Sequence, residues 1–235
     1  MLRTTLHHRH TGVSAGFRPR GTEVTRIEGF SDAVLAFALT LLVVSLEVPH
    51  TYEELIATMK GFVPFAICFA LLMQIWFKHY GFFRRYGLQD PETRVLNAVL
   101  LFIVLFYVYP LKFLWTHLVI HRADVPTGVA EGRVLMVIYG LGGAAVFTIF
   151  VLLYVHAWRL RDALELNELE RFDTRAEIRE NLLLAGVPAV SVLLAIALPD
   201  RLVGFAGLVY FAYAPLMTWQ GMRSGKQRRA LETQP

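Results

Sequence analysis

The sequence predicts an all-α protein, built as a bundle of six transmembrane helices. Hydrophobic residues make up 55% of the 235 residues and charged residues only 18%, and the mean hydropathy is +0.48. A soluble domain carries about a quarter of charged residues. The apolar residues are gathered in blocks of roughly 20, the length that an α-helix needs to cross a hydrocarbon core. One membrane domain accounts for this composition.

Six apolar segments can be drawn as spans, and prolines punctuate the connections between them. The spans cover residues about 28–48, 57–79, 95–119, 133–157, 181–198 and 202–221. Glycines and prolines inside these segments are typical of membrane bundles, where neighbouring helices satisfy the freed backbone groups. The last two spans are joined only by Pro199, Asp200 and Arg201, so we expect a tight helical hairpin.

Lysine and arginine are unevenly divided between the two sides that six spans create. The N-terminal segment, the 2/3 and 4/5 connections and the C-terminal segment hold 18 of the 23 basic residues. Cytoplasmic loops carry such an excess, so we predict a multi-pass protein of the cell membrane with both termini cytoplasmic. Nucleic acid is not an expected partner, because the basic residues are spread over four segments without a binding motif.

The chain divides into three parts along its length. Residues 1–25 are polar and basic and lack the apolar stretch of a cleavable signal peptide, so we predict a disordered cytoplasmic tail. Residues 26–222 form the six-span domain, and residues 223–235 form a second basic cytoplasmic tail. Residues 159–180 alternate charge signs with leucine at helical spacing, which predicts an extension of the fourth span or a short surface helix.

Residues with metal or catalytic chemistry are few. Cys68 is the single cysteine, so the chain can form neither an internal disulfide nor a multi-cysteine metal site. His79 and His156 are the pair that could bridge helices as haem ligands, although interfacial histidines explain them more simply. Ser31 beside Asp32 does not make a nucleophile and base, since adjacent helix residues point about 100° apart. We predict no enzyme activity, no metal site and no cofactor.

The first span begins with charged and polar side chains, which are Arg26, Glu28, Ser31 and Asp32. An interfacial helix start would explain them, with Arg26 reaching toward headgroups and acidic groups near the helix N-terminus. Alternatively, Asp32 lies inside the membrane boundary, where it must face protein or water and be paired. Arg26 lies roughly 240° around the helix from Asp32, so the partner must come from another helix.

The second span offers such partners. Trp76 and His79 are three residues apart near its end, so they share one helix face at a depth that matches Asp32. Their indole N–H and imidazole could hydrogen-bond to the first span.

The first span also carries a spaced pattern of polar and small residues. It comprises Arg26, Phe30, Ser31, Asp32, Ala36, Thr40, Leu41, Leu42 and the closing Pro49. Trp76 and His79 follow in the second span, and Asn97 opens the third. Together these residues resemble the signature of the transmembrane protein 175 potassium-channel family, whose prokaryotic members are short six-span proteins. The resemblance covers about residues 26–221 and is strongest in the first two spans.

The resemblance implies a homotetramer in which the first helix of each subunit lines a central pore. The family lacks the TVGYG filter of other potassium channels, as this sequence does, and discriminates ions at narrow rings of apolar side chains. At helical spacing the pore-lining face would consist of Ala33, Phe37, Thr40 and Val44. Phe37 stands where the family usually has an isoleucine at its narrowest ring, so it would form the constriction and gate.

The remaining signature residues would hold the pore helix against the second span. By resemblance this network comprises Arg26, Phe30, Ser31, Asp32, Trp76 and His79.

The implied function is a cation channel that selects or prefers potassium, with K+ as the permeating ion and membrane lipid and further copies of the chain as partners. An ion-coupled or proton-coupled secondary transporter and a non-transporting structural membrane protein remain as alternatives. A transporter buries a polar substrate site at mid-membrane, and the middle of the first span offers only Thr40. The sequence predicts no gating stimulus.

Overall fold

The computed structural model describes residues 16–44, 49–120 and 128–232, and every regular element in these ranges is helical. The α-helices are α2 (Arg26–Val44), α3 (Tyr52–Lys60), α4 (Phe62–Tyr86), α5 (Pro91–Ile120), α6 (Val129–Arg159), α7 (Glu168–Ala197), α8 (Gly204–Leu208) and α9 (Tyr213–Glu232). Short 3-10 turns, Asp200–Leu202 and Val209–Ala212, flank α8. The all-α prediction is confirmed.

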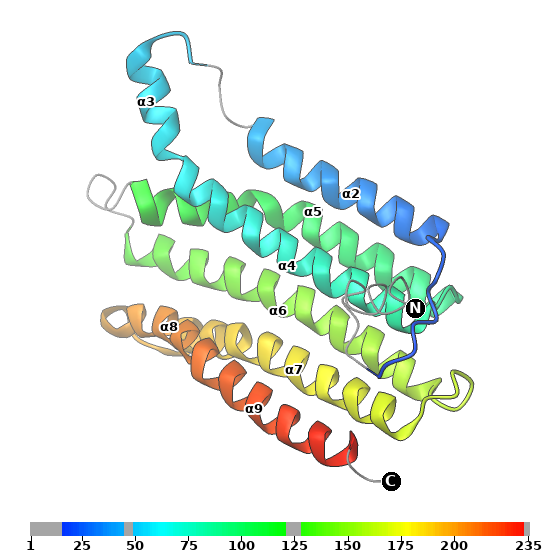
Figure 1. Ribbon diagram of the computed structural model, residues 1–235. Helices are drawn as coiled ribbons and strands as arrows, with labels where there is room; N and C mark the ends of the chain where they lie inside the picture. Colours follow the sequence, from blue (N-terminus) through cyan, green and yellow to red (C-terminus); the bar gives the residue numbers. More distant parts are fainter. Residues whose placement is uncertain (1–15, 45–48, 121–127, 233–235) are drawn as a thin grey trace.

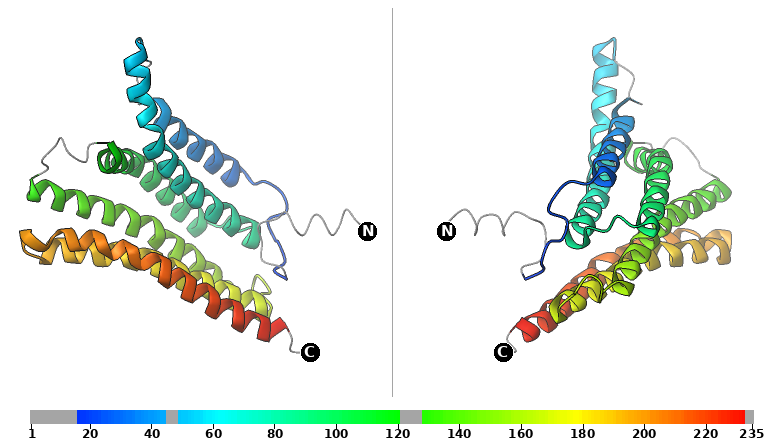
Figure 2. Two further views of the ribbon diagram at one scale, coloured as in Figure 1. Left: turned by 60° about the vertical axis from the view of Figure 1, so that its left-hand side comes forward. Right: turned by 90° about the vertical axis from the view of Figure 1, so that its right-hand side faces the viewer.

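Figure 1 shows α2, α4 and α5 grouped together, followed by α6, α7 and α9. α2 packs against α4 and α5, α5 packs against α6, and α7 packs against α6 and α9. α3 projects beyond the other helices at one end of the bundle, as both views of Figure 2 show. The start of α2, the end of α4, the start of α7 and the end of α9 lie together at the opposite end. The connections predicted to be cytoplasmic therefore share one end of the bundle.

Five described helical segments are long and apolar enough to cross a membrane. They are Phe62–Tyr86, Pro91–Thr116, Ala130–Arg159, Glu168–Ala197 and Asp200–Leu231, and they match the second to sixth predicted spans. α2, with 19 residues and charged side chains in its first two turns, is not among them. These five segments make the chain a multi-pass membrane protein. A sixth membrane crossing would have to be α2, the first predicted span.

The charged segment between the fourth and fifth predicted spans belongs to the fifth. α6 ends at Arg159, and Asn167 starts a new helix as its N-cap: Asn167 Oδ1 accepts from the Glu170 backbone N–H at 2.8 Å, while the Glu170 carboxylate accepts from the Asn167 N–H at 3.0 Å. This capping box begins a helix that continues unbroken to Ala197. The prediction of an extension of the fourth span or a separate surface helix was wrong.

The predicted hairpin of the last two spans is present, and a tyrosine hydrogen bond joins its two helices. Pro188 lies inside α7, and because proline has no N–H, the Leu184 carbonyl four residues earlier loses its helical partner. The Tyr213 hydroxyl of α9 donates to this carbonyl at 2.7 Å. α9 then runs on to Glu232, so residues 223–232 continue the last helix instead of forming a separate tail.

Residues 16–25, which we call the N-terminal strap, are packed against the bundle. Phe17 is only 4% exposed and meets the Tyr86 ring edge-on at 5.6 Å between ring centroids. Arg18 and Arg20 hydrogen-bond and ion-pair with Glu170, whose side chain is fully buried. The prediction of a disordered tail is wrong for the strap, because a buried phenyl ring and a buried carboxylate hold it. Residues 1–15 lie outside the described part of the chain.

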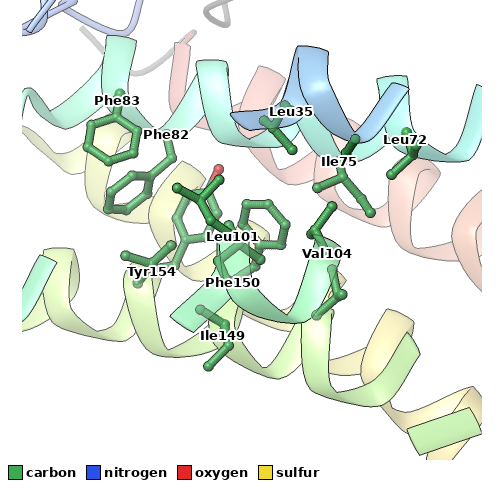
Figure 3. Packing of buried hydrophobic residues seen from close by; sticks show 14 of the residues in the cluster. Leu35, Leu72, Ile75, Phe82, Phe83, Leu101, Val104, Ile149, Phe150 and Tyr154 are labelled. Carbon is green, nitrogen blue, oxygen red and sulfur yellow. The ribbon is translucent and has the colours of Figure 1, made fainter. Parts of the chain in front are cut away.

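The apolar core lies between α2, α4, α5 and α6 (Figure 3). Leu35 of α2 and Ile75 of α4 point toward Leu101 and Val104 of α5, and Phe150 of α6 closes the cluster from the other side. All five are buried. At about 25 cal/mol per Å² of apolar area, this burial fixes which face of α2 looks inward.

Glycine permits the close approach of α6 and α7. A Cβ added at Gly140 would lie 2.9 Å from the Pro188 carbonyl oxygen and would overlap the Val192 side chain. We expect Gly140→Ala to lower the free energy of unfolding by about 1–3 kcal/mol, as overpacking does in cores. Gly186→Ala on α7 is the control, since no atom lies within 4 Å of its added Cβ, and it should raise stability by roughly 0.5–1 kcal/mol. Thermal unfolding in detergent would measure both; equal losses would contradict the close-approach explanation.

Candidate functional site

α2 buries one face against α4 and α5. Ser31, Leu35, Ala38 and Leu42 recur every three to four residues along it, and each is at most 4% exposed. At the start of the helix, Thr25 and Glu28 form a capping box: the Glu28 carboxylate accepts from the Thr25 N–H at 2.9 Å and the Thr25 hydroxyl accepts from the Glu28 N–H at 3.2 Å. Glu28 is therefore structural, and its Thr-x-x-Glu spacing is visible in the sequence.

The opposite face of α2 is uncovered in the single chain. Ala33, Ala36, Phe37 and Thr40 are all exposed, and Phe37 is 56% exposed although it is a large apolar side chain. The Thr40 hydroxyl donates to the Phe37 carbonyl at 2.7 Å, which leaves its oxygen lone pairs free to accept. Ala33, Phe37 and Thr40 are three of the four residues predicted to line a pore. The side chain of the fourth, Val44, lies outside what the structure describes.

A buried hydrogen-bond chain joins α4, α5 and α2. His79 Nε2 lies 2.9 Å from Asn97 Oδ1, the Asn97 amide donates to the Ser31 hydroxyl at 2.8 Å, and Ser31 donates to the Ile27 carbonyl at 2.8 Å. Since the Asn97 Oδ1 atom can only accept, His79 Nε2 must carry the hydrogen. The three side chains are at most 3% exposed. This chain fixes the rotation of α2 about its own axis.

A second contact ties α2 to α4 at the edge of the buried face. The Trp76 indole N–H donates to Asp32 Oδ1 at 2.8 Å, and the Trp76 ring stacks on Tyr80. The spacing of the second span predicted partners for Asp32 at this depth. Trp76 is one of them, whereas His79 turns to Asn97 instead. Asn97 links α4 to α2; the sequence placed it in the resemblance to the family signature, at the start of the third span, but did not predict this contact.

The structure brings Ser31, Asp32, Trp76 and His79 together but leaves Arg26 and Phe30 outside the network. Both are exposed, Phe30 to 65%, and within the described residues neither contacts the network. The helical repeat explains this, because steps of four, three and four residues place Arg26 and Phe30 on the same stripe as Ala33 and Phe37. The uncovered face therefore starts at the first turn of α2.

The far end of α2 is held by a lysine. Lys112 of α5 donates to the Leu42 backbone carbonyl at 2.8 Å. Carbonyls in the last turn of a helix lack internal partners, and positive charge near them is favourable. α2 is thus anchored to α5 near both of its ends.

The other histidine weighed as a haem ligand belongs to a separate cluster. His156 of α6 lies 3.0 Å from Asp90 Oδ1 and 3.1 Å from Glu92 Oε2, so its partners differ from those of His79. Among the described residues, no group of three or more histidine, cysteine or acidic side chains is placed to hold a metal ion.

Asp90 starts α5 and should make stability depend on pH. Its carboxylate accepts from the Thr93 N–H and hydroxyl and from His156; burial raises its pKa, but these hydrogen bonds outweigh burial and lower the pKa to about 2. We expect Asp90→Ala to cost about 1 kcal/mol of stability at neutral pH, as loss of an N-cap does. A lowered pKa contributes stability above the unfolded-state value of about 4, and this is lost as the pH falls toward 2. Melting of both proteins at pH 7, 5 and 3 checks this; a constant difference would contradict it.

Comparisons with known proteins agree on one family. The family described as endosomal/lysosomal potassium channel TMEM175 matches residues 26–107. A protein of Marivirga tractuosa named "Potassium channel" is 43% identical over 236 residues, covering 94% of this chain and 95% of that protein. A second, the potassium channel Cha6605_3372 of Chamaesiphon minutus, is 32% identical over 51% of this chain and 63% of its own length.

Two solved structures resemble this fold along most of its length. The potassium channel MtTMEM175, a threonine-to-alanine variant bound to a nanobody–MBP fusion, superposes with a TM-score of 0.81 at 41% identity, covering 91% of this chain and 98% of that one. The lysosomal potassium-selective channel TMEM175 homolog from Chamaesiphon minutus has a TM-score of 0.58 at 26% identity, covering 85% and 96%. The sequence and the fold together place this chain in the TMEM175 potassium-channel family.

Proposed function

We propose that this chain is a subunit of a homotetrameric potassium channel whose pore is lined by the uncovered face of α2. The proposal rests on this face, which is exposed in the single chain, whereas the opposite face of α2 packs against α4 and α5. α2, the first predicted span, then adds a sixth membrane crossing to the other five. Relatives that are named potassium channels and that cover nearly the whole chain support the same reading.

The uncovered face suits close contact between copies of α2. Ala33 and Ala36 are small, and small residues let membrane helices approach closely. Four copies around one axis would repeat Phe37 and Thr40 as successive rings one turn apart. The buried network behind this face would keep each Phe37 at the same angle to the axis, which a symmetric ring requires.

The Phe37 ring is proposed as the constriction and gate, without a TVGYG filter. A narrow apolar ring opposes ions because they must shed water there, and it can close by dewetting. K+ holds its hydration shell less tightly than Na+, so such a ring favours K+. The Thr40 hydroxyl oxygens, which keep free lone pairs, would accept a partly dehydrated ion beside the ring. Val44 would add a further apolar ring.

The bundle end that carries the strap is proposed to face the cytoplasm. The strap, the helix ends beside the α4–α5 and α6–α7 connections, and the end of α9 hold most of the basic residues and lie at this end. Arg26 and Phe30 would then surround the cytoplasmic mouth of the pore.

Ion flux through the purified protein in liposomes tests the proposal. Opposing K+ and Na+ gradients, with an ionophore as a positive control and empty liposomes as a negative one, separate the candidate functions. We expect flux that follows the electrochemical gradient and favours K+. Flux coupled strictly to a second ion would point to a transporter, and absence of flux to a structural membrane protein; either would overturn the channel. Cross-linking in the same liposomes would show whether four copies assemble.

A further inference from the structure

A groove of about 600 Å³ lies between α7 and α9, near the bundle end that carries the strap. Apolar atoms of Phe172, Ile178, Ala230 and Leu231 form much of its wall, and Arg175 and Arg179 add two positive charges. No acidic side chain lines it. A second cavity, of about 480 Å³, differs in this respect, because its two cations face Glu177 and Glu180. Of these two cavities, the first combines an apolar wall with positive charge that no lining carboxylate compensates.

The two arginines of this groove are held in place without carboxylates. The Arg175 guanidinium lies 5.0 Å from the centre of the Trp158 ring, and the Arg179 guanidinium lies 5.9 Å from the centre of the Phe172 ring. Stacking on a ring orients a guanidinium and leaves its N–H groups available. Both side chains are exposed.

Neighbouring arginines, by contrast, are paired with acids. Arg171 meets Asp162 at 2.8 Å, and Arg228 meets Asp173 at 3.2 Å. Among the described residues, neither Arg175 nor Arg179 lies within 4.0 Å of a carboxylate oxygen. The groove therefore presents two guanidinium groups, each with five N–H donors, and no carboxylate among its lining residues.

The depth of the arginines matches the headgroup layer of a membrane. The apolar part of α7 starts at about residue 181. Arg179 precedes it by two residues and Arg175 by six, which is about 3 and 9 Å along the helix axis. Ile178 lies between the two arginines in depth and provides apolar surface for the glycerol of a lipid on the membrane side of Arg175.

We propose that this groove binds the headgroup of an anionic phospholipid. A phosphodiester accepts two parallel hydrogen bonds from a guanidinium, and basic pockets between membrane helices on the cytoplasmic side favour such lipids. The acyl chains would lie along α7 and α9. The proposal does not depend on ion conduction.

The test measures which lipids stay with the protein. The full chain is reconstituted in vesicles of equal phosphatidylglycerol and phosphatidylcholine, extracted in mild detergent, and its retained lipids are counted by mass spectrometry. We expect several-fold enrichment of phosphatidylglycerol, which the double variant Arg175→Gln, Arg179→Gln should lose. The matched control, Arg223→Gln with Lys226→Gln, removes the same charge from α9 outside the groove, with Arg223 also stacked on a ring, and should retain the enrichment.

Thermal unfolding separates a lipid from free phosphate. Short-chain phosphatidylglycerol should raise the melting temperature of the wild-type chain, whereas short-chain phosphatidylcholine and inorganic phosphate at equal concentration should not. Equal stabilisation by inorganic phosphate, or equal enrichment in all three proteins, would overturn the lipid site. If the glutamine variant does not fold, Arg175→Lys with Arg179→Lys keeps the charge without the planar fork; it should weaken enrichment, and undiminished enrichment would contradict the guanidinium site.

Discussion

Phe37→Ala should raise cation flux several-fold and lower the ratio of K+ to Na+ flux. Phe37 is 56% exposed in the single chain and is the largest side chain in the middle of the uncovered face of α2. If it forms the narrowest ring of the pore, replacing four phenyl groups by methyl groups widens the ring and lets ions pass with more of their water. Flux assays in liposomes with K+ and Na+ gradients measure both changes.

The control for Phe37 is a phenylalanine on another helix that is at least as exposed. Phe106 of α5 is 72% exposed and removes the same volume when replaced by alanine. Phe106→Ala should leave the rate and the ion ratio as in the wild type. Equal changes in both variants would contradict the assignment of Phe37 to the pore, and unchanged flux in Phe37→Ala would move the constriction elsewhere along α2.

Asn97→Leu should destabilise the protein by about 2–4 kcal/mol, because it removes the link between His79 and Ser31. The His79 Nε2–H would remain buried without an acceptor, and each such orphan costs roughly 1–3 kcal/mol, with the lost amide bond added. Ser31 keeps its bond to the Ile27 carbonyl. Thermal unfolding in detergent measures the loss, and flux should fall with it if α2 rotates out of register.

A second substitution distinguishes the hydrogen-bond chain from simple loss of packing. Replacing both partners of a buried hydrogen bond by apolar groups of similar shape is often nearly neutral. Asn97→Leu combined with His79→Phe should therefore recover much of the stability that Asn97→Leu loses. If the double variant is less stable than the single one, the cost lies in packing and the buried chain is not its source.

Helix positions could be predicted from the sequence because they depend on local composition. The apolar blocks located the second to sixth spans, although α4, α7 and α9 each extend beyond the predicted boundaries. Gly61 ends α3, so α4 starts at Phe62 and not at 57. Asn167 likewise sets the start of α7 at Glu168. These capping signals were present in the sequence, but they were weaker than the hydropathy signal of the spans.

The contacts of the site were predictable in part. Matching depth on two spans was enough to propose Trp76 as a partner of Asp32, because a carboxylate inside the membrane boundary needs a donor. Counting the helical repeat further would have placed Arg26 and Phe30 on the uncovered stripe. The role of Asn97 was not predictable, since nothing local shows which of two neighbouring spans an amide will face.

The N-terminal strap has a consequence for the synthesis of the chain. Arg20 is joined to Glu170 across 150 residues of sequence. The strap is translated early, yet Glu170 is translated only after the fourth span. Until then, the growing chain lacks the contact between the strap and α7. The strap can therefore take its final position only when translation has passed the fourth span.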